Sequence, residues 1–343
     1  MKRISELDLD NIYFHTKELW GGLEGKSVFI TGATGFFGKW MLESLLHINK
    51  KLSLNMRITA LSRDPDRFLK EYPFYVQESS ITFIKGDIQS FEFPKEKFNY
   101  IIHAATDADA KLNSENPLEM IDTIIQGTRH ILEFATAQPL ASFMLTSSGA
   151  IYGNQTPQVT HTSENDSFHI NINDPSVAYA EGKRIAELLC STYHHSVKLP
   201  VKIARCFAFV GPYLPLNKHF AIGNFISNGL NGEDIVIRGD GTPFRSYMYA
   251  SDLIIWLWTI LIKGKDNEPY NVGSDQALSI EQTAAEVASQ FEGITYKILT
   301  VPSGLPAARY VPSIKKAESD LGLRITIDIK EAINRTKIFH TQL

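Results

Sequence analysis

Three side chains of this sequence form a pattern that can move a proton. Tyr179 and Lys183 are four residues apart in a stretch with helical apolar spacing, so both lie on one face of the helix. A lysine ammonium near a phenol favours the phenolate, which can take a proton from a hydroxyl while hydride leaves the same carbon. Such a pair also occurs by chance in many helices. Ser148 strengthens the pattern because it follows an apolar strand at the end where open α/β sheets bind ligands. We predict that all three are catalytic.

A glycine triplet near the N-terminus predicts a dinucleotide site. Gly32, Gly35 and Gly38 come directly after an apolar strand and at the start of a helical pattern. Glycine is needed where the backbone turns tightly and approaches a pyrophosphate, and the helix offers free N–H groups to the phosphates. A tight strand–helix turn also explains a lone triplet, but here strand, spacing and position agree. The predicted loop residues are Gly32, Thr34, Gly35, Phe36, Phe37 and Gly38.

The remaining cofactor residues are expected at the ends of later strands. Ser62 and Arg63 occupy the tip of the second strand, with Asp64 one step beyond. An acid at this tip favours NAD and an arginine favours the 2′-phosphate of NADP, so both cofactors stay open. Asp87 suits a hydrogen bond to the adenine amino group, although a surface turn explains it nearly as well. The predicted site is completed by Ile88, Ala104, Ala105 and Thr106.

Short apolar runs alternate with longer helical patterns through the first ~200 residues. The expected strands are 27–31, 57–62, 81–85, 100–103, 142–147 and 201–207, and the expected helices include 37–46, 117–137 and 178–194. This alternation predicts an α/β fold with a doubly wound, Rossmann-type parallel sheet. After about Gly211, Gly- and Pro-rich loops separate shorter elements, which predicts a smaller C-terminal α/β substrate lobe. We therefore expect an N-terminal extension at 1–25, an NAD(P)-binding domain at 26–210 with a return segment near 248–275, and a mainly substrate-binding lobe at 211–343.

These motifs resemble the extended short-chain dehydrogenase/reductases, and more narrowly the NAD-dependent epimerase/dehydratase family. The similarity runs from about Lys26 to about Leu323 and includes the glycine triplet, Ser148, Tyr179-x-x-x-Lys183 and the stretch 239–252. The family includes 4-epimerases, 4,6-dehydratases and UDP-glucuronate decarboxylases, which act on nucleotide sugars through a 4-keto hexose. The resemblance implies a tightly bound NAD or NADP and a nucleotide-diphosphate sugar as the substrate.

The resemblance also assigns roles to single residues. Tyr179 matches the general base at the C4 hydroxyl, Lys183 tunes it and binds the nicotinamide ribose, and Ser148 bonds the same hydroxyl. Arg245 and Arg309 match arginines that contact the nucleotide diphosphate, which suits the guanidinium fork, although both could be merely solvated. Asn224 is expected to contact the substrate as well. In related homodimers two helices of each subunit form a four-helix interface, for which 117–137 and 178–194 are the matching candidates.

The sequence departs from part of the family directly after Ser148. Dehydratases carry an Asp-Glu pair there and decarboxylases a glutamate, whereas this chain has Gly149 and Ala150, which cannot move a proton. A 4-epimerase needs no such acid, so we favour that reaction. The stretches 179–190 and 239–252 look more like decarboxylases and dehydratases, which keeps open a reaction of that kind with a relocated acid. A third possibility is an inactive cofactor-binding regulator, which would not need Ser148, Tyr179 and Lys183 together.

Composition excludes several other classes. The 343 residues are 43% hydrophobic and carry a formal charge of −4 without a basic block, which argues against a nucleic-acid partner. Two cysteines without ligand spacing predict neither a disulfide framework nor a metal site. The longest apolar run, 253–262, is too short to span a bilayer and predicts a buried helix. With no apolar signal core at the N-terminus, we expect a cytoplasmic protein without a membrane partner.

Overall fold

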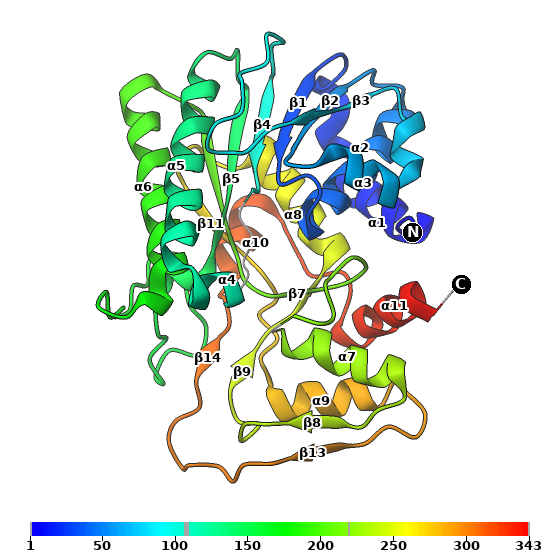
Figure 1. Ribbon diagram of the computed structural model, residues 1–343, viewed down its shortest axis with the longest axis vertical. Coiled ribbons are helices and arrows are strands. Elements are labelled where there is room, and N and C mark those ends of the chain that lie inside the picture. Colours follow the sequence, from blue (N-terminus) through cyan, green and yellow to red (C-terminus); the bar gives the residue numbers. More distant parts are fainter. Residues whose placement is uncertain (1, 106–109, 219, 342–343) are drawn as a thin grey trace. The chain divides into compact units, whose positions relative to one another are not determined.

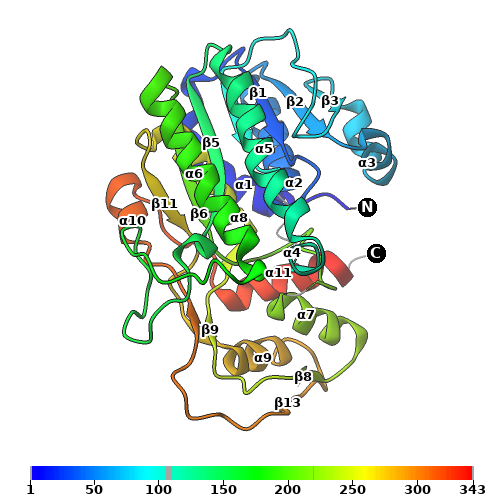
Figure 2. The same ribbon diagram turned by 60° about the vertical axis from the view of Figure 1, so that its left-hand side comes forward.

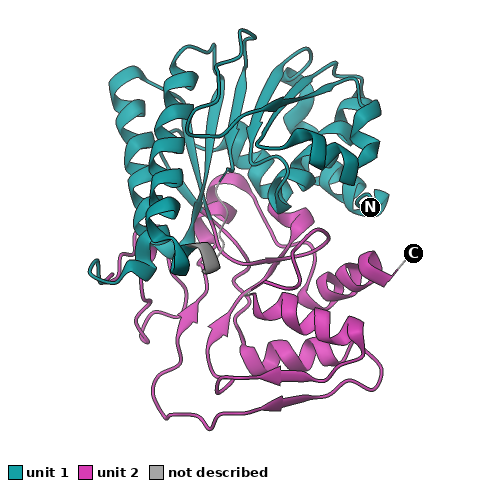
Figure 3. Cartoon of the chain, viewed as in Figure 1, with its two compact units in different colours: residues 1–151, 171–205, 254–270 teal, residues 152–170, 206–253, 271–343 magenta. Residues whose placement is uncertain are grey.

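The computed structural model describes residues 2–105, 110–218 and 220–341 (Figure 1). The chain forms two compact units, drawn in different colours in Figure 3. Unit 1 comprises residues 1–151, 171–205 and 254–270, and unit 2 comprises 152–170, 206–253 and 271–343. The two units therefore alternate along the chain.

A seven-stranded sheet with the order β11-β6-β5-β4-β1-β2-β3 organises unit 1. Its strands are β1 (Ser27–Thr31), β2 (Arg57–Ser62), β3 (Ile81–Lys85), β4 (Tyr100–His103), β5 (Ser142–Ser148), β6 (Val201–Cys206) and β11 (Pro269–Val272). The pairs from β3 to β5 are parallel, and β1 and β5 are buried along their whole length, as strands covered on both faces must be. The order reverses at β1, which has β2 on one side and β4 on the other. The predicted Rossmann-type fold is confirmed.

Helices of unit 1 carry and cover the sheet. They include α2 (Phe36–Leu52), α3 (Pro65–Glu71), α4 (Ala110–Glu115), α5 (Pro117–Thr136), α6 (Ala178–Val197) and most of α8 (Ala250–Lys263). In both views α5 and α6 lie side by side (Figures 1 and 2). A Cβ at Gly182 of α6 would come within 3.0 Å of Ile124 on α5, so this glycine lets the two helices approach closely. The predicted buried helix at 253–262 is confirmed, since Trp256 and Trp258 of α8 are almost fully buried.

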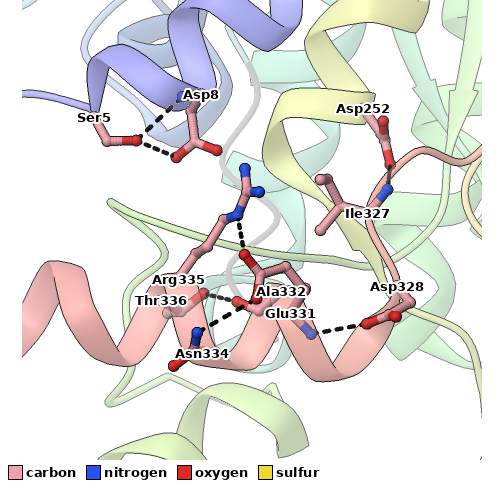
Figure 4. A network of polar contacts seen from close by, with 10 residues as sticks. All are labelled: Ser5, Asp8, Asp252, Ile327, Asp328, Glu331, Ala332, Asn334, Arg335 and Thr336. Atoms are coloured by element: carbon pink, nitrogen blue, oxygen red, sulfur yellow. Dashed lines mark hydrogen bonds and ion pairs between the residues drawn. The ribbon is translucent and has the colours of Figure 1, made fainter.

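The N-terminal segment is an ordered part of unit 1. It forms α1 (Glu6–Thr16) and a 3₁₀ turn, η1 (Lys17–Gly22), and Ser5 caps α1 by exchanging hydrogen bonds with Asp8 (Figure 4). The amide of Ile4 donates to the buried carboxylate of Glu43 on α2 at 3.0 Å. Trp20 is buried and packs edge-on against Trp258, with ring centroids 5.6 Å apart. Because its contacts reach α2 and α8, the segment belongs to the core of unit 1.

The described residues of unit 2 form three small sheets and four helices. The sheets are β10 (Met248–Tyr249) with β7 (Phe209–Val210), β12 (Leu278–Ser279) with β9 (Phe244–Arg245) and β14 (Arg309–Tyr310), and β13 (Tyr296–Ile298) with β8 (Ile235–Ile237). The helices are α7 (Ala221–Asn231), α9 (Ile280–Ala288), α10 (Lys315–Leu321) and α11 (Ile329–Thr341).

A buried carboxylate fixes the entry to α11 within unit 2. Asp252, which is fully buried, accepts the amides of Thr326 and Ile327 at 3.0 Å each. Asp328 then accepts the amide of Glu331, and Glu331 binds Arg335 one turn on (Figure 4). Asp252 thus holds the segment that leads into α11, and Asp328 satisfies an amide in the first turn that has no partner within the helix.

Candidate active site

Ser148 is the last residue of β5 and is buried. Its Oγ accepts the amide of Ala150 at 3.1 Å. A hydroxyl that accepts through its lone pair still has a hydrogen to donate, so Ser148 can bind a further oxygen. The strand end and the short turn after it, η3 (Gly149–Tyr152), therefore hold a hydrogen-bond donor at the edge predicted for a ligand.

Tyr179 and Lys183 lie in the first turns of α6, as predicted. Lys183 is only 3% exposed, and its ammonium donates to the main-chain oxygen of Thr146 on β5 at 2.8 Å. That ammonium lies 6.0 Å from the centre of the Tyr179 ring. The start of the helix is held by Asn113, whose Oδ1 accepts the amide of Tyr179 at 3.0 Å. A lysine charge is thus fixed beside the phenol and next to β5.

The glycine loop connects β1 to α2 and needs its glycines for steric reasons. Gly32 has φ +70°, and a Cβ there would lie 2.3 Å from the main-chain oxygen of Ala104. A Cβ at Gly38 would lie 2.3 Å from the oxygen of Gly32. Gly35 is the N-cap of α2 and contributes no side-chain hydrogen bond to its first turn. Such a closely packed loop, with a helix start that lacks a capping side chain, fits a dinucleotide phosphate.

A buried polar chain joins this loop to the end of β4. Nδ1 of His103 lies 2.9 Å from Oγ1 of Thr31, and its Nε2 lies 3.2 Å from Oγ1 of Thr128 on α5. Thr31 also accepts the amides of Ala104 and Ala105, at 3.2 Å each. Burial, together with the charge of Lys183, lowers the pKa of His103 to about 3. His103 is therefore a neutral structural residue. The predicted cofactor residue Thr106 lies outside the described residues.

The predicted adenosine end is built from the tips of β2 and β3. Ser62 is buried and accepts the amide of Asp64 at 3.2 Å, whereas Arg63 is exposed. Asp64 caps α3 by accepting the amide of Arg67 at 3.1 Å. Asp87 accepts the amide of Gln89 at 2.9 Å, and the neighbouring Ile88 is buried. Asp64 and Asp87 both accept hydrogen bonds within local turns. A role for Asp87 at the adenine stays a prediction.

The predicted substrate residues lie in unit 2, where Arg245 and Arg309 occupy neighbouring strands. In the register of β9 and β14, Arg309 pairs with Phe244 and Tyr310 with Arg245. The Arg309 guanidinium lies 4.1 Å from the centre of the Phe244 ring, and Arg245 donates to the main-chain oxygen of Phe244 at 2.8 Å. Asn224 lies on α7 and is exposed. Binding of a diphosphate by these residues stays a prediction.

Sequence reasoning missed the residues that support the predicted catalytic side chains. Asn113 and Thr146 bond to Tyr179 and Lys183 on α6, and Glu187 bonds to Ser147 on β5 and follows Lys183 by one helical turn. That spacing was the available signal. Within the described residues, no group of three or more His, Cys, Asp and Glu side chains could hold a metal, and no helix is long and apolar enough to cross a membrane.

Comparisons with known proteins agree on one family. The profile of the NAD dependent epimerase/dehydratase family matches residues 28–273. UDP-glucuronic acid decarboxylase 1 of Xenopus tropicalis is 28% identical over 91% of this chain and 71% of its own length. The human dTDP-D-glucose 4,6-dehydratase is 28% identical over 79% and 76%, respectively. An epimerase structure from Methanothermobacter thermautotrophicus shares the fold, with a TM-score of 0.79, 25% identity and 96% coverage of each chain.

Proposed function

Because this chain belongs to the NAD-dependent epimerase/dehydratase family, we propose that it is a nucleotide-sugar 4-epimerase. Members of this family are enzymes that modify nucleotide sugars, and the three predicted catalytic residues are present and held by the fold. A regulator that only binds a cofactor has no need of a buried lysine anchored beside a tyrosine, together with a serine hydroxyl at the end of β5.

The side chains of unit 1 account for the proton chemistry. Tyr179 takes the proton from the C4 hydroxyl, and the ammonium of Lys183 stabilises the phenolate. Ser148 donates a hydrogen bond to the same oxygen and orients it. NAD, when bound, would supply the hydride acceptor and donor that this chemistry at C4 needs. The glycine loop and the start of α2 would hold its pyrophosphate, as argued above.

One observation favours epimerisation. After Ser148 the chain continues with Gly149 and Ala150, and the amide of Ala150 is bound to Oγ of Ser148. Neither residue can remove a proton from C5 or protonate a leaving hydroxyl. In a 4-epimerase the keto sugar only turns over and takes the hydride on its other face, so the missing carboxylate is no loss.

A second candidate is a decarboxylase or dehydratase in which another acid replaces the missing one. Its support is the similarity to UDP-glucuronic acid decarboxylases and dTDP-glucose dehydratases over most of the chain. We place NAD ahead of NADP, since the family is NAD-dependent, although Arg63 at the tip of β2 keeps NADP open. The proposed substrate is a nucleotide-diphosphate sugar held by Ser148, Asn224, Arg245 and Arg309.

We also propose a homodimer formed through α5 and α6. Leu118 on α5 and Leu188 on α6 are 78% and 64% exposed, which leaves apolar surface on both helices. Light scattering on the wild type and on Leu188→Glu should show a dimer and a monomer, respectively. A wild-type monomer would exclude the dimer.

The test of the reaction is incubation with a panel of nucleotide hexoses and uronic acids in D2O, followed by mass spectrometry and NMR. An epimerase gives a product of unchanged mass, inverted at C4 and free of deuterium. Loss of water with deuterium at C5, or loss of carbon dioxide, would establish the second candidate instead. Tyr179→Phe should abolish turnover and retain the cofactor, which checks the assignment of the base.

A further inference from the structure

Glu187 on α6 is the centre of a cluster that the catalytic roles leave unexplained. Oγ of Ser147 donates to its Oε1 at 2.5 Å. The Arg205 guanidinium donates to both oxygens, with Nε at 3.1 Å and 3.2 Å and the terminal nitrogen at 2.8 Å. The side chains of Arg205 and Glu187 are only 13% and 11% exposed. A carboxylate this buried is stable only when it is paired, and Arg205 provides the pairing.

The cluster contacts β5 directly before Ser148, so it can affect where the proposed catalytic serine lies. Lys183 binds the main-chain oxygen of Thr146, and Glu187, one turn further along α6, binds the side chain of Ser147. Thr146 and Ser147 directly precede Ser148 on β5. Two consecutive turns of α6 are thus bonded to the two residues before the catalytic serine.

Arg205 ties a third element to the cluster. It lies on β6, which neighbours β5 in the sheet. Its bidentate contact therefore holds Glu187 against the sheet from the side of β6, whereas Ser147 holds it from β5. The charges of Glu187 and Lys183 also affect the thiol of Cys190. Burial raises the pKa of this thiol most, the charge of Glu187 raises it further, and the charge of Lys183 lowers it.

We propose that Glu187 is a positioning residue, which fixes α6 against the end of β5 through Ser147 and Arg205 and thereby sets the separation of Ser148 from Tyr179. This proposal rests on the proposed function. Proton transfer at C4 needs both hydroxyl groups at one oxygen, and a small displacement of reacting groups slows chemistry far more than binding.

Ser147→Ala is the sharpest variant because it removes one contact and leaves Glu187 paired with Arg205. The expected result is a fall of about 10-fold or more in the rate of cofactor reduction in a single turnover, with the affinity for NAD and the KM for the sugar nearly unchanged. A substrate deuterated at C4 should show a larger isotope effect on kcat than in the wild type, since chemistry becomes slower. Glu187→Gln, which keeps an acceptor for Ser147 but loses the charge, should show the same direction of change.

The matched control is Asp266→Asn, which breaks an ion pair to Lys202 on the same strand as Arg205. It should leave the reduction rate unchanged. The positioning role is overturned if Ser147→Ala reduces the cofactor at the wild-type rate, or if the control slows it equally. Failure of the proposed function looks different: the wild type would then turn over no nucleotide sugar at all, or Tyr179→Phe would remain active.

Discussion

The backbone of Gly32 lies so close to the backbone of Ala104 that a Cβ on the glycine would be 2.3 Å from the alanine main-chain oxygen. The residue after β1 and the residue after β4 are thus in contact at the place where the strand order reverses. The predicted phosphate loop begins at the same place. Packing and cofactor binding therefore both require a residue without a Cβ at position 32.

Gly32→Ala should therefore destabilise the protein and weaken NAD binding. Gly25→Ala is the matched control, because Gly25 also has a positive φ, +66°, but nothing lies within 4 Å of its Cβ position. The control should lose only the cost of the left-handed backbone, about 1–2 kcal/mol, and bind NAD normally. Gly32→Ala should lose more, which chemical denaturation and cofactor titration would measure. Equal losses in the two variants would contradict the steric argument.

Lys183→Met should lower kcat by about 10²- to 10⁴-fold, because it removes the charge beside Tyr179 while filling the same buried space. The protein should still fold, since a buried charge is replaced by an apolar chain of similar length. Arg184→Ala breaks the partly exposed pair with Glu181 and should stay within about twofold of the wild type. Steady-state kinetics with a nucleotide sugar distinguishes the two, and a fully active Lys183→Met would remove lysine from the mechanism.

The neutral, buried His103 should make stability fall with acid. Its pKa of about 3 lies below the ordinary value of 6.5. At a pH between these two values, His103 is protonated in the unfolded chain but stays neutral in the native state. Its contribution is therefore complete above pH 6.5 and is lost as the pH falls towards 3. The loss from pH 7.5 to pH 5 is about 2 kcal/mol.

The slope of the free energy of unfolding against pH can be measured by urea unfolding between pH 7.5 and pH 5. His103→Asn should flatten the dependence by about that amount, whatever it costs at neutral pH. An unchanged slope in His103→Asn would assign the acid sensitivity to other groups.

The N-terminal segment should contribute strongly to the stability of unit 1. Trp20→Ala removes a fully buried indole from its contact with Trp258 and should cost about 3–5 kcal/mol. Phe14→Ala, on the same segment but 64% exposed, should change the free energy of unfolding by no more than about 0.5 kcal/mol. Differential scanning calorimetry measures both. A mild effect of Trp20→Ala would show that the segment is only loosely attached.

Sequence patterns predicted six of the seven strands in the sheet of unit 1 almost residue by residue, whereas β11 was not predicted. The first four strands have the predicted bounds, and β5 and β6 each differ by one residue at the C-terminal end. Buried parallel strands are continuous apolar runs, which are easy to recognise. The elements that hold the predicted catalytic residues were equally clear, because Ser148 ends a strand and Tyr179 and Lys183 lie at the start of a helix.

Contacts between distant segments were not predictable. No periodicity indicates that Glu43 receives the amide of Ile4, or that Trp20 meets a tryptophan more than two hundred residues away. The same holds for Glu187, whose helical position was evident but whose partners on β5 and β6 were not. The small strands of unit 2, often two residues long, are also too short to leave a pattern.

The alternation of the two units along the chain bears on how the protein is made. The chain passes between units after residues 151, 170, 205, 253 and 270. During synthesis, unit 1 lacks its last segment until residue 270 has left the ribosome, although domains generally fold from the N-terminus onward. Neither unit can be detached by a single cut or exchanged as one block between homologous genes. Exchanging one unit alone would need a crossover at each of these boundaries.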